Sequence, residues 1–316
     1  MDKRDTDVQS KTNQDIVDED STDIFDTSLF SLFSIPPIGF ESDSNGYFTY
    51  YPPSSSSTPN PNSNGRIPKH IKLKIPKPPS SLYTTLQAQL IWPSSIFLAD
   101  LISKGDIDVS NKNVIELGSS AGLPSIVTYL KNCKEIVSTD YDVQEVVDIL
   151  NENFNSVTQQ IESQGDQDVM TNFSNSKRWT VLGHCWGEDV KPLLEAISPY
   201  STEEFSNIDT EISKEEKPKF DIILAADVIW TTSTHEILLD SIQSLINPEN
   251  GIVHITVGLH TGRGPLKRFI ESAKQRNFKI DIKGEFRLNG WDKYNENMSN
   301  PGEEERGVVV WFTMKL

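Results

Sequence analysis

The sequence is poor in cysteine and contains no long apolar run. Its two cysteines, Cys133 and Cys185, form no Cys-x-x-Cys pair, so no disulfide framework is indicated. No stretch approaches the roughly 20 apolar residues of a membrane span. The first residues, Met-Asp-Lys-Arg-Asp, match neither a secretory nor a mitochondrial signal. We therefore expect a cytoplasmic protein with reduced thiols and no membrane partner, with the nucleus as the alternative location.

Basic residues are also scarce, because 29 Lys and Arg stand against 46 Asp and Glu and give a net charge of −17. Binding to nucleic-acid phosphates needs clustered Lys and Arg, so this balance argues against a nucleic-acid partner. The negative charge is compatible with a basic protein partner and, more commonly, with solubility alone. We expect a monomer.

The first 80 residues differ in composition from the rest of the chain. They begin acidic and polar, and residues 52–65 are rich in Ser, Pro and Asn. Such a composition buries too little apolar surface to order a chain, so we expect residues 1–80 to be a largely disordered arm before a domain of residues 81–316. Residues 24–40 are unusually apolar and either fold back onto the domain or bind a partner. The alternation over residues 71–75 predicts a short strand that ends at Pro76.

From Gln87 onward, apolar runs of strand length alternate with stretches of helical periodicity. This pattern predicts an α/β domain with a mostly parallel seven-stranded sheet. No helix separates the last two strands, so they should pair antiparallel. Insertions near 156–177 and at 198–217 are expected to be surface loops. The predicted strands cover 114–118, 135–139, 178–182, 220–226, 251–258, 279–288 and 307–315. The predicted helices cover 92–101, 123–130, 143–154, 235–246 and 265–276.

The most specific motif is Glu-Leu-Gly-Ser-Ser-Ala-Gly-Leu-Pro at 116–124, which follows the first predicted strand of the domain. Gly118 and Gly122 allow a tight turn and leave room for a ligand beside the backbone. Asp140 ends the next strand, about where an acid that binds ribose hydroxyls is expected. A tight turn without a ligand would explain the glycines alone, but their pairing with Asp140 favours a nucleoside-containing cofactor.

The glycine spacing argues against phosphate-bearing cofactors. The sequence has no Gly-x-Gly-x-x-Gly at this turn and no Gly-Lys-Ser/Thr, and Pro124 falls in the first helical turn. S-adenosylmethionine, which carries no phosphate, is the better match. The histidines show no metal-ligand spacing, so no zinc site is expected, and no Gly-x-Ser-x-Gly indicates a hydrolase.

From about Gln87 to Leu316 the chain resembles the family 16 methyltransferases, which are lysine methyltransferase-like and include fungal members similar to nicotinamide N-methyltransferase. The motifs that carry this resemblance are Trp92-Pro93, Glu116 to Leu123, Asp140, Trp186-Gly187 and Ala226-Asp227. The resemblance implies an S-adenosylmethionine-dependent methyltransferase on a Rossmann-like sheet. It makes the following residues candidates for cofactor binding: Trp92, Glu116, Gly118, Ser119, Ser120, Gly122, Asp140, Tyr141, Trp186 and Ala226.

Two positions depart from the family pattern. Ser120 replaces the middle glycine of the loop, and Asp227-Val-Ile-Trp230 replaces the usual Asp-x-x-Tyr. Asp227 is the candidate catalytic residue that positions an amine; a helix cap or a cofactor contact would explain it equally well. Trp230 is the second catalytic candidate, as an aromatic wall that attracts a cationic amine. The acceptor is expected to approach between Asp227–Trp230 and the loop His260–Arg263.

The leading functional hypothesis is a protein-lysine N-methyltransferase, whose partner is the protein that bears the acceptor lysine. A small-molecule N-methyltransferase that acts on a nicotinamide-like amine is the first alternative. A non-catalytic scaffold that binds the cofactor is the second alternative. Methyl transfer from a sulfonium is a direct displacement, so alignment in a dry pocket is the main task of such an enzyme.

Overall fold

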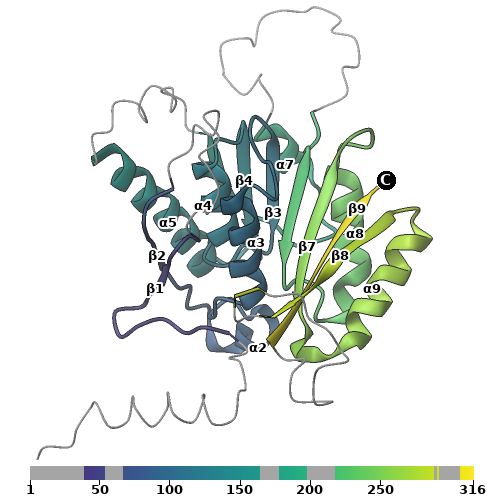
Figure 1. The fold of residues 1–316 in the computed structure, drawn as a ribbon, viewed down its shortest axis with the longest axis horizontal. Helices are drawn as coiled ribbons and strands as arrows, with labels where there is room; N and C mark the ends of the chain where they lie inside the picture. The colour runs from purple at the N-terminus through teal and green to yellow at the C-terminus, as the bar shows by residue number, and fades with distance from the viewer. Residues whose placement is uncertain (1–38, 54–66, 164–177, 198–217, 288–289, 292–306) are drawn as a thin grey trace, which may run out of the picture. The chain divides into compact units, whose positions relative to one another are not determined.

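The computed structural model describes residues 39–53, 67–163, 178–197, 218–287, 290–291 and 307–316. Its centre is a seven-stranded sheet in the order β5-β4-β3-β6-β7-β9-β8, as Figure 1 shows in part. This confirms the predicted seven strands of the domain. Their bounds are β3 Asn113–Leu117, β4 Glu135–Asp140, β5 Trp179–Gly183, β6 Ile222–Ala226, β7 Ile252–Gly258, β8 Lys279–Arg287 and β9 Val308–Lys315.

Strands β3 to β7 are parallel, and β9 lies antiparallel between β7 and β8. The predicted antiparallel pairing of the last two strands is therefore confirmed. The chain runs outward from β3 through β4 to β5 and then returns to β6 on the other side of β3. Between β3 and β6 the strand order thus reverses, and a cleft forms at the carboxyl ends of such strands.

Helices cover both faces of the sheet, and residues that alternate along each strand pack into two separate apolar clusters. Val114 contributes to one cluster with α3 (Pro93–Lys104), α4 (Leu123–Leu130) and α5 (Gln144–Ser163). Its neighbour Ile115 contributes to the other with α7 (Lys191–Glu195), α8 (His235–Leu245) and α9 (Arg263–Gln275). Because side chains alternate along a strand, this division is the expected one for a sheet buried on both faces.

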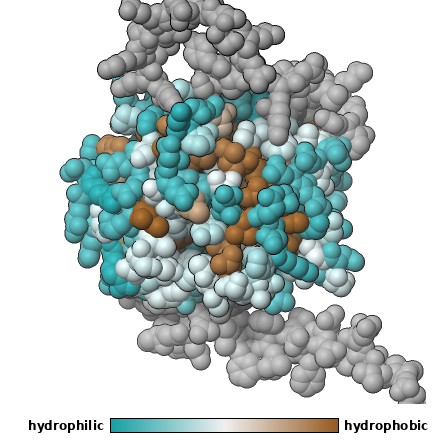
Figure 2. All heavy atoms as spheres, turned by 180° about the vertical axis from the view of Figure 1, so that it is seen from behind, coloured by the Kyte–Doolittle hydropathy of each residue, from teal (hydrophilic) through white to brown (hydrophobic). Residues whose placement is uncertain are grey.

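The two faces can be followed in the figures. Figure 1 shows α3 in front of the sheet and α8 behind it. Figure 2 views the protein from behind: hydrophilic residues cover most of the coloured surface, and apolar ones gather near the middle. No helix in the described ranges is long and apolar enough to cross a lipid bilayer.

The prediction of a surface loop from residue 156 was wrong for its first part. Helix α5 continues to Ser163, because Val157 and Ile161 extend the apolar stripe of Leu150 and Phe154 at helical spacing. Val157 is buried and Ile161 packs against the same cluster. The rest of that insertion, residues 164–177, and the second insertion, 198–217, lie outside the described residues.

Two short strands precede the domain, of which the sequence predicted one. β2 (Ile71–Lys74) confirms the strand expected from the alternation, and it pairs antiparallel with β1 (Tyr47–Tyr50), which the sequence did not predict. Asn153 of α5 bonds the backbone N–H and C=O of Lys74 at 2.8 and 2.9 Å. The Tyr50 hydroxyl donates to buried Asp100 of α3 at 2.6 Å. The described part of the expected arm therefore packs on α3 and α5, and the boundary at residue 80 stays a prediction.

The apolar segment 24–40 lies almost wholly outside the described residues. Of it the structure describes Gly39 and Phe40, and Phe40 forms an isolated antiparallel bridge with Ile91, with backbone bonds of 2.8 and 2.9 Å. Whether residues 24–38 fold back or bind a partner stays open.

Candidate active site

A cavity of about 500 Å³ lies where the carboxyl ends of β3, β4, β5 and β6 meet. A volume of this size suits a ligand larger than a simple metabolite. Short helices and loops close it on the other sides: α2 (Tyr83–Leu86) and η3 (Thr232–Thr234) contribute hydroxyl side chains. Of the candidate residues, the following line the cavity: Trp92, Gly118, Ser120, Asp140, Tyr141, Trp186, Ala226, Asp227 and Trp230.

The loop after β3 forms one wall of the cavity. The backbone N–H groups of Gly118 and Ser119 donate to Thr139 O at 3.0 and 2.9 Å, so the loop lies against the end of β4. Gly118 has a φ of +76°, and a Cβ there would lie 2.8 Å from Val228 Cγ1. Glycine is therefore required at this position both for its backbone conformation and for space.

Asp140 connects this loop to β4. Its carboxylate accepts hydrogen bonds from Ser120 N–H at 2.7 Å and from Tyr141 N–H at 2.8 Å. Burial raises the pKa of Asp140 to about 6, and the two N–H donors oppose that rise. The group is therefore mostly ionised at pH 7. Each carboxylate oxygen has a second lone pair, so Asp140 can also accept from ligand hydroxyls in the cavity.

Three candidate cofactor residues lie outside the cavity lining. Glu116 accepts the N–H of Ser125 at 2.9 Å and also the Ser125 hydroxyl, and so caps the first turn of α4. Burial raises the pKa of Glu116 to about 8. Ser119 accepts a bond of 2.8 Å from the Ser138 hydroxyl. A Cβ on Gly122 would lie 2.4 Å from Leu150 Cδ1. These three residues support the loop and do not line the cavity.

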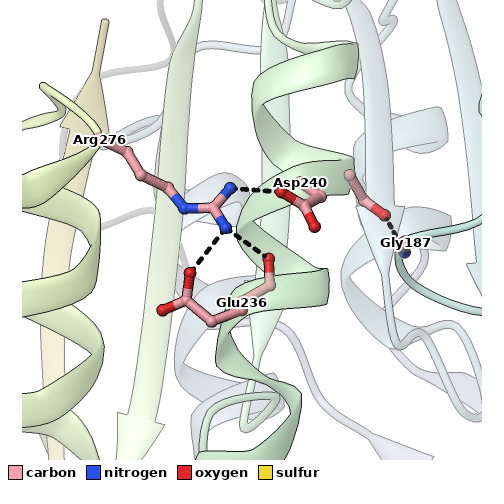
Figure 3. A network of polar contacts seen from close by, with 5 residues as sticks. Gly187, Glu236, Asp240 and Arg276 are labelled. Carbon is pink, nitrogen blue, oxygen red and sulfur yellow. Dashed lines mark hydrogen bonds and ion pairs between the residues drawn. The ribbon is translucent and has the colours of Figure 1, made fainter.

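Trp92 and Trp186 are aromatic walls that other side chains hold in place. Trp92 Nε1–H donates to Gln87 O at 3.1 Å, and its ring stacks on His260 with centroids 4.7 Å apart. The loop of Trp186 is fixed through its neighbour Gly187, whose N–H donates to the hydroxyl of buried Ser241 at 2.8 Å. Figure 3 shows this bond beside α8.

Helix α8, which carries Ser241, is itself tied to the end of α9. Arg276 forms ion pairs with Glu236 at 2.7 Å and Asp240 at 2.5 Å, and it also donates to Glu236 O at 3.2 Å (Figure 3). Ser241 also lies 3.2 Å from His184 Nε2. Sequence reasoning did not find Ser241, because nothing in an amphipathic helix marks one of its serines as a partner of a distant loop.

Asp227 is buried and turned toward neighbouring elements. Its carboxylate accepts from the hydroxyl of Ser94 on α3 and from Gly258 N–H at 3.1 Å, and it lies 3.8 Å from His260 Nδ1. Burial raises its pKa, and the neighbouring His260 opposes the rise. The carboxylate makes no capping bond to η3. The interpretation of Asp227 as a helix cap is therefore wrong. That Asp227 contacts the cofactor or positions the acceptor amine stays a prediction.

The cavity lining is rich in hydroxyl groups. Besides Trp230, it includes Thr231, Ser233 and Thr234 after β6 and Thr84 and Thr85 of α2. The loop His260–Arg263, expected to form the acceptor path, does not line the cavity. His260 stacks on Trp92, and Arg263 pairs with Glu285 at 2.6 Å. Sequence reasoning missed the α2 threonines, since a short Tyr-Thr-Thr-Leu stretch carries no recognisable signal.

The chemistry of the lining limits what the cavity can bind. Among the described residues that line the cavity there is no Lys or Arg. Two carboxylates, those of Asp140 and Asp227, belong to the lining. Such a lining disfavours phosphate and favours a cation. No group of three or more metal-ligating side chains occurs in the described ranges. A ligand with ribose hydroxyls, an aromatic base and a positive charge fits these donors and walls.

The strand order, the glycine loop and the acid at the end of β4 define the protein as an S-adenosylmethionine-dependent methyltransferase. Residues 83–173 match the lysine methyltransferase family. The protein N-terminal and lysine N-methyltransferase efm7 of Schizosaccharomyces pombe is 30% identical over 218 residues, which cover 68% of this chain and 71% of that protein. Its counterpart EFM7 from Candida albicans is 29% identical over 204 residues, 63% of this chain and 68% of the relative. The chain belongs to the lysine methyltransferase family.

The fold agrees with this membership. A solved methyltransferase structure complexed with SAH superposes with a TM-score of 0.50 at 10% sequence identity. The match covers 94% of this chain and 66% of that chain. At this identity the likeness concerns the fold.

Proposed function

We propose that the protein transfers a methyl group to a nitrogen of a protein acceptor, either a lysine side chain or an N-terminal amino group. The observation that carries the proposal is the cavity itself, whose described lining contains no Lys or Arg and combines Asp140 and Trp230 with several hydroxyl side chains. The relatives from S. pombe and C. albicans are named for both acceptor types, which supports a protein substrate.

Different residues would hold the parts of the cofactor. Asp140 would accept the ribose hydroxyls, Trp186 would pack on the adenine, and Gly118 would let the amino-acid part approach the backbone. Trp92 and Ala226 complete the pocket. When bound, S-adenosylmethionine supplies a methyl group on a positively charged sulfur. The carboxylates of Asp140 and Asp227 would favour that charge, and the apolar Val228, which lines the cavity, would help to exclude water from it.

Trp230 and Asp227 are the residues proposed to bind and orient the acceptor amine. An amine must lose its proton to attack a methyl group, and partial burial lowers its pKa by disfavouring the ammonium form. Trp230 would pack against the aliphatic part of a lysine or attract the ammonium before it loses its proton. Asp227 is held by Ser94 and Gly258, so it would orient the amine from a fixed position rather than move with it.

The test is transfer from radiolabelled S-adenosylmethionine into a cell lysate, with protein and small molecules separated afterwards. Label in protein that appears with the wild-type chain and is absent with Gly118→Arg supports the proposal. Nuclease treatment of the lysate should leave the signal unchanged, since no nucleic acid is needed. Label that enters small molecules alone would mean that the acceptor is a metabolite. Cofactor binding without any transfer would mean that the protein is a scaffold.

A further inference from the structure

One wall of the cavity is a segment with little packing of its own. We call residues 79–88 the strap; it contains η1 (Ser80–Leu82) and α2, and neither short helix has a buried residue. Thr84, Thr85, Leu86, Gln87 and Ala88 line the cavity. The strap therefore covers a ligand site without being anchored by an apolar face.

Two hydrogen bonds connect the strap to other described residues. Trp92 Nε1–H donates to Gln87 O at 3.1 Å, a contact with the segment that follows the strap. The Ser120 hydroxyl donates to Ala88 O at 2.9 Å, and this bond joins the strap to the loop after β3. Further hydrogen bonds lie within the strap, from Leu82 N to Pro79 O, from Tyr83 N to Ser80 O, from Gln87 N to Tyr83 O and from Gln87 Nε2 to Thr84 O.

Ser120 has an unfavourable backbone conformation for a residue with a side chain. Its φ is +49°, in the left-handed region where glycine is far less strained. Its N–H donates to Asp140 at 2.7 Å, while its hydroxyl reaches Ala88. A glycine would relieve the backbone but could not make the second contact. The side chain of Ser120 therefore strains the backbone but makes one hydrogen bond to the strap.

We propose that Ser120 is a positioning residue that holds the strap closed over the cofactor cavity and thereby slows cofactor release. Asp140, the residue proposed to accept the ribose hydroxyls, holds the N–H of the same serine. Ser120 therefore contacts both the proposed ribose-binding carboxylate, through its N–H, and the strap, through its hydroxyl. This inference rests on the placement of the cofactor in this cavity.

The experiment compares Ser120→Ala, which removes the hydroxyl and keeps the strained backbone, with Ser120→Gly, which removes both. Stopped-flow fluorescence would measure dissociation of S-adenosylhomocysteine, with initial rates for KM and single-turnover transfer for the chemical step. Both variants should release S-adenosylhomocysteine about three- to tenfold faster, the size of one neutral hydrogen bond. The KM for the cofactor should rise with it, while single-turnover transfer at saturating cofactor stays within twofold.

The two variants should differ in stability. Ser120→Gly should melt at a higher temperature than Ser120→Ala because it loses the strain, although both release the cofactor faster. Amide exchange over residues 82–88 should speed up in both. Faster release in Ser120→Ala alone would mean that loop strain controls release, and unchanged release in both would remove the hydroxyl contact from the mechanism. Gly118→Arg distinguishes failure of the proposed cofactor site from failure of the proposed role of Ser120. If Gly118→Arg also leaves cofactor affinity unchanged, the cofactor does not bind in this cavity, and the proposed cofactor site is wrong.

Discussion

Replacing Asp140 tests the cofactor site most directly, since its carboxylate is the acid at the end of β4 and already accepts two backbone bonds. A ribose hydroxyl that donates to a carboxylate makes a charge-assisted bond worth about 1.5–3 kcal/mol. Asp140→Asn keeps the shape and removes the charge, so the Kd for S-adenosylmethionine should rise roughly 10- to 150-fold.

The pH dependence of Asp140 gives a second readout with a definite sign. Its pKa is about 6 in the folded chain against an ordinary value of 3.8. The folded protein therefore binds this proton first as the pH falls, and the contribution of Asp140 to stability increases between about pH 6 and pH 4. Cofactor affinity should change in the opposite direction, because the ionised carboxylate is the acceptor. The Kd should rise up to about tenfold per pH unit below pH 6.

Isothermal titration calorimetry between pH 5 and pH 8 would measure the affinity, and the melting temperature over the same pH range would report the change in stability. The wild-type protein should lose affinity below pH 6, and Asp140→Asn should bind weakly and show no such dependence. Asp106→Asn is the matched control, because Asp106 is exposed in the turn after α3 and does not line the cavity. Unchanged affinity in Asp140→Asn, or an identical pH profile in both proteins, would refute the role of Asp140 in the cofactor site.

Three further outcomes are expected. Gly118→Arg should abolish cofactor binding in calorimetry yet keep the far-UV circular dichroism spectrum, since its side chain would enter the cavity beside Val228. In single-turnover assays, Trp230→Ala and Asp227→Asn should lower the rate of methyl transfer by an order of magnitude or more, with cofactor affinity nearly intact. Trp230→Tyr should be tolerated. Equal losses of transfer and affinity in Asp227→Asn would assign Asp227 to the cofactor site. Deleting residues 1–38 should leave cofactor affinity unchanged in calorimetry, because the described lining of the cavity begins at Thr84. Deleting residues 1–66 should lower the melting temperature by several degrees, because β1 and the bond from Tyr50 to Asp100 are lost. A stable, unaltered protein after the longer deletion would place the domain boundary near residue 80.

The sequence by itself determined the seven strands of the domain, five of its helices and their order along the chain, but not the short helices α2 and α7. Helix α4 has the predicted bounds, Leu123–Leu130, and each of the seven strands lies within two residues of its predicted position at either end. These features depend on apolar periodicity and on glycine or proline at the ends, which are properties of neighbouring residues. The motif around Gly118 and the acid Asp140 could be recognised for the same reason, since strand, turn and acid follow one another along the chain.

The tertiary structure decided which side chain faces the cavity and which supports it. Glu116 and Gly118 are two residues apart, yet the glutamate caps α4 and the glycine borders the cavity. Ser94 meets Asp227 across 133 positions, and Ser120 meets Ala88 across 32. Such contacts depend on how the helices pack on the sheet and on the exact end of each strand. Local periodicity carries no information about either, so a sequence pattern can place the site at an edge of the sheet but cannot assign the partners of its residues.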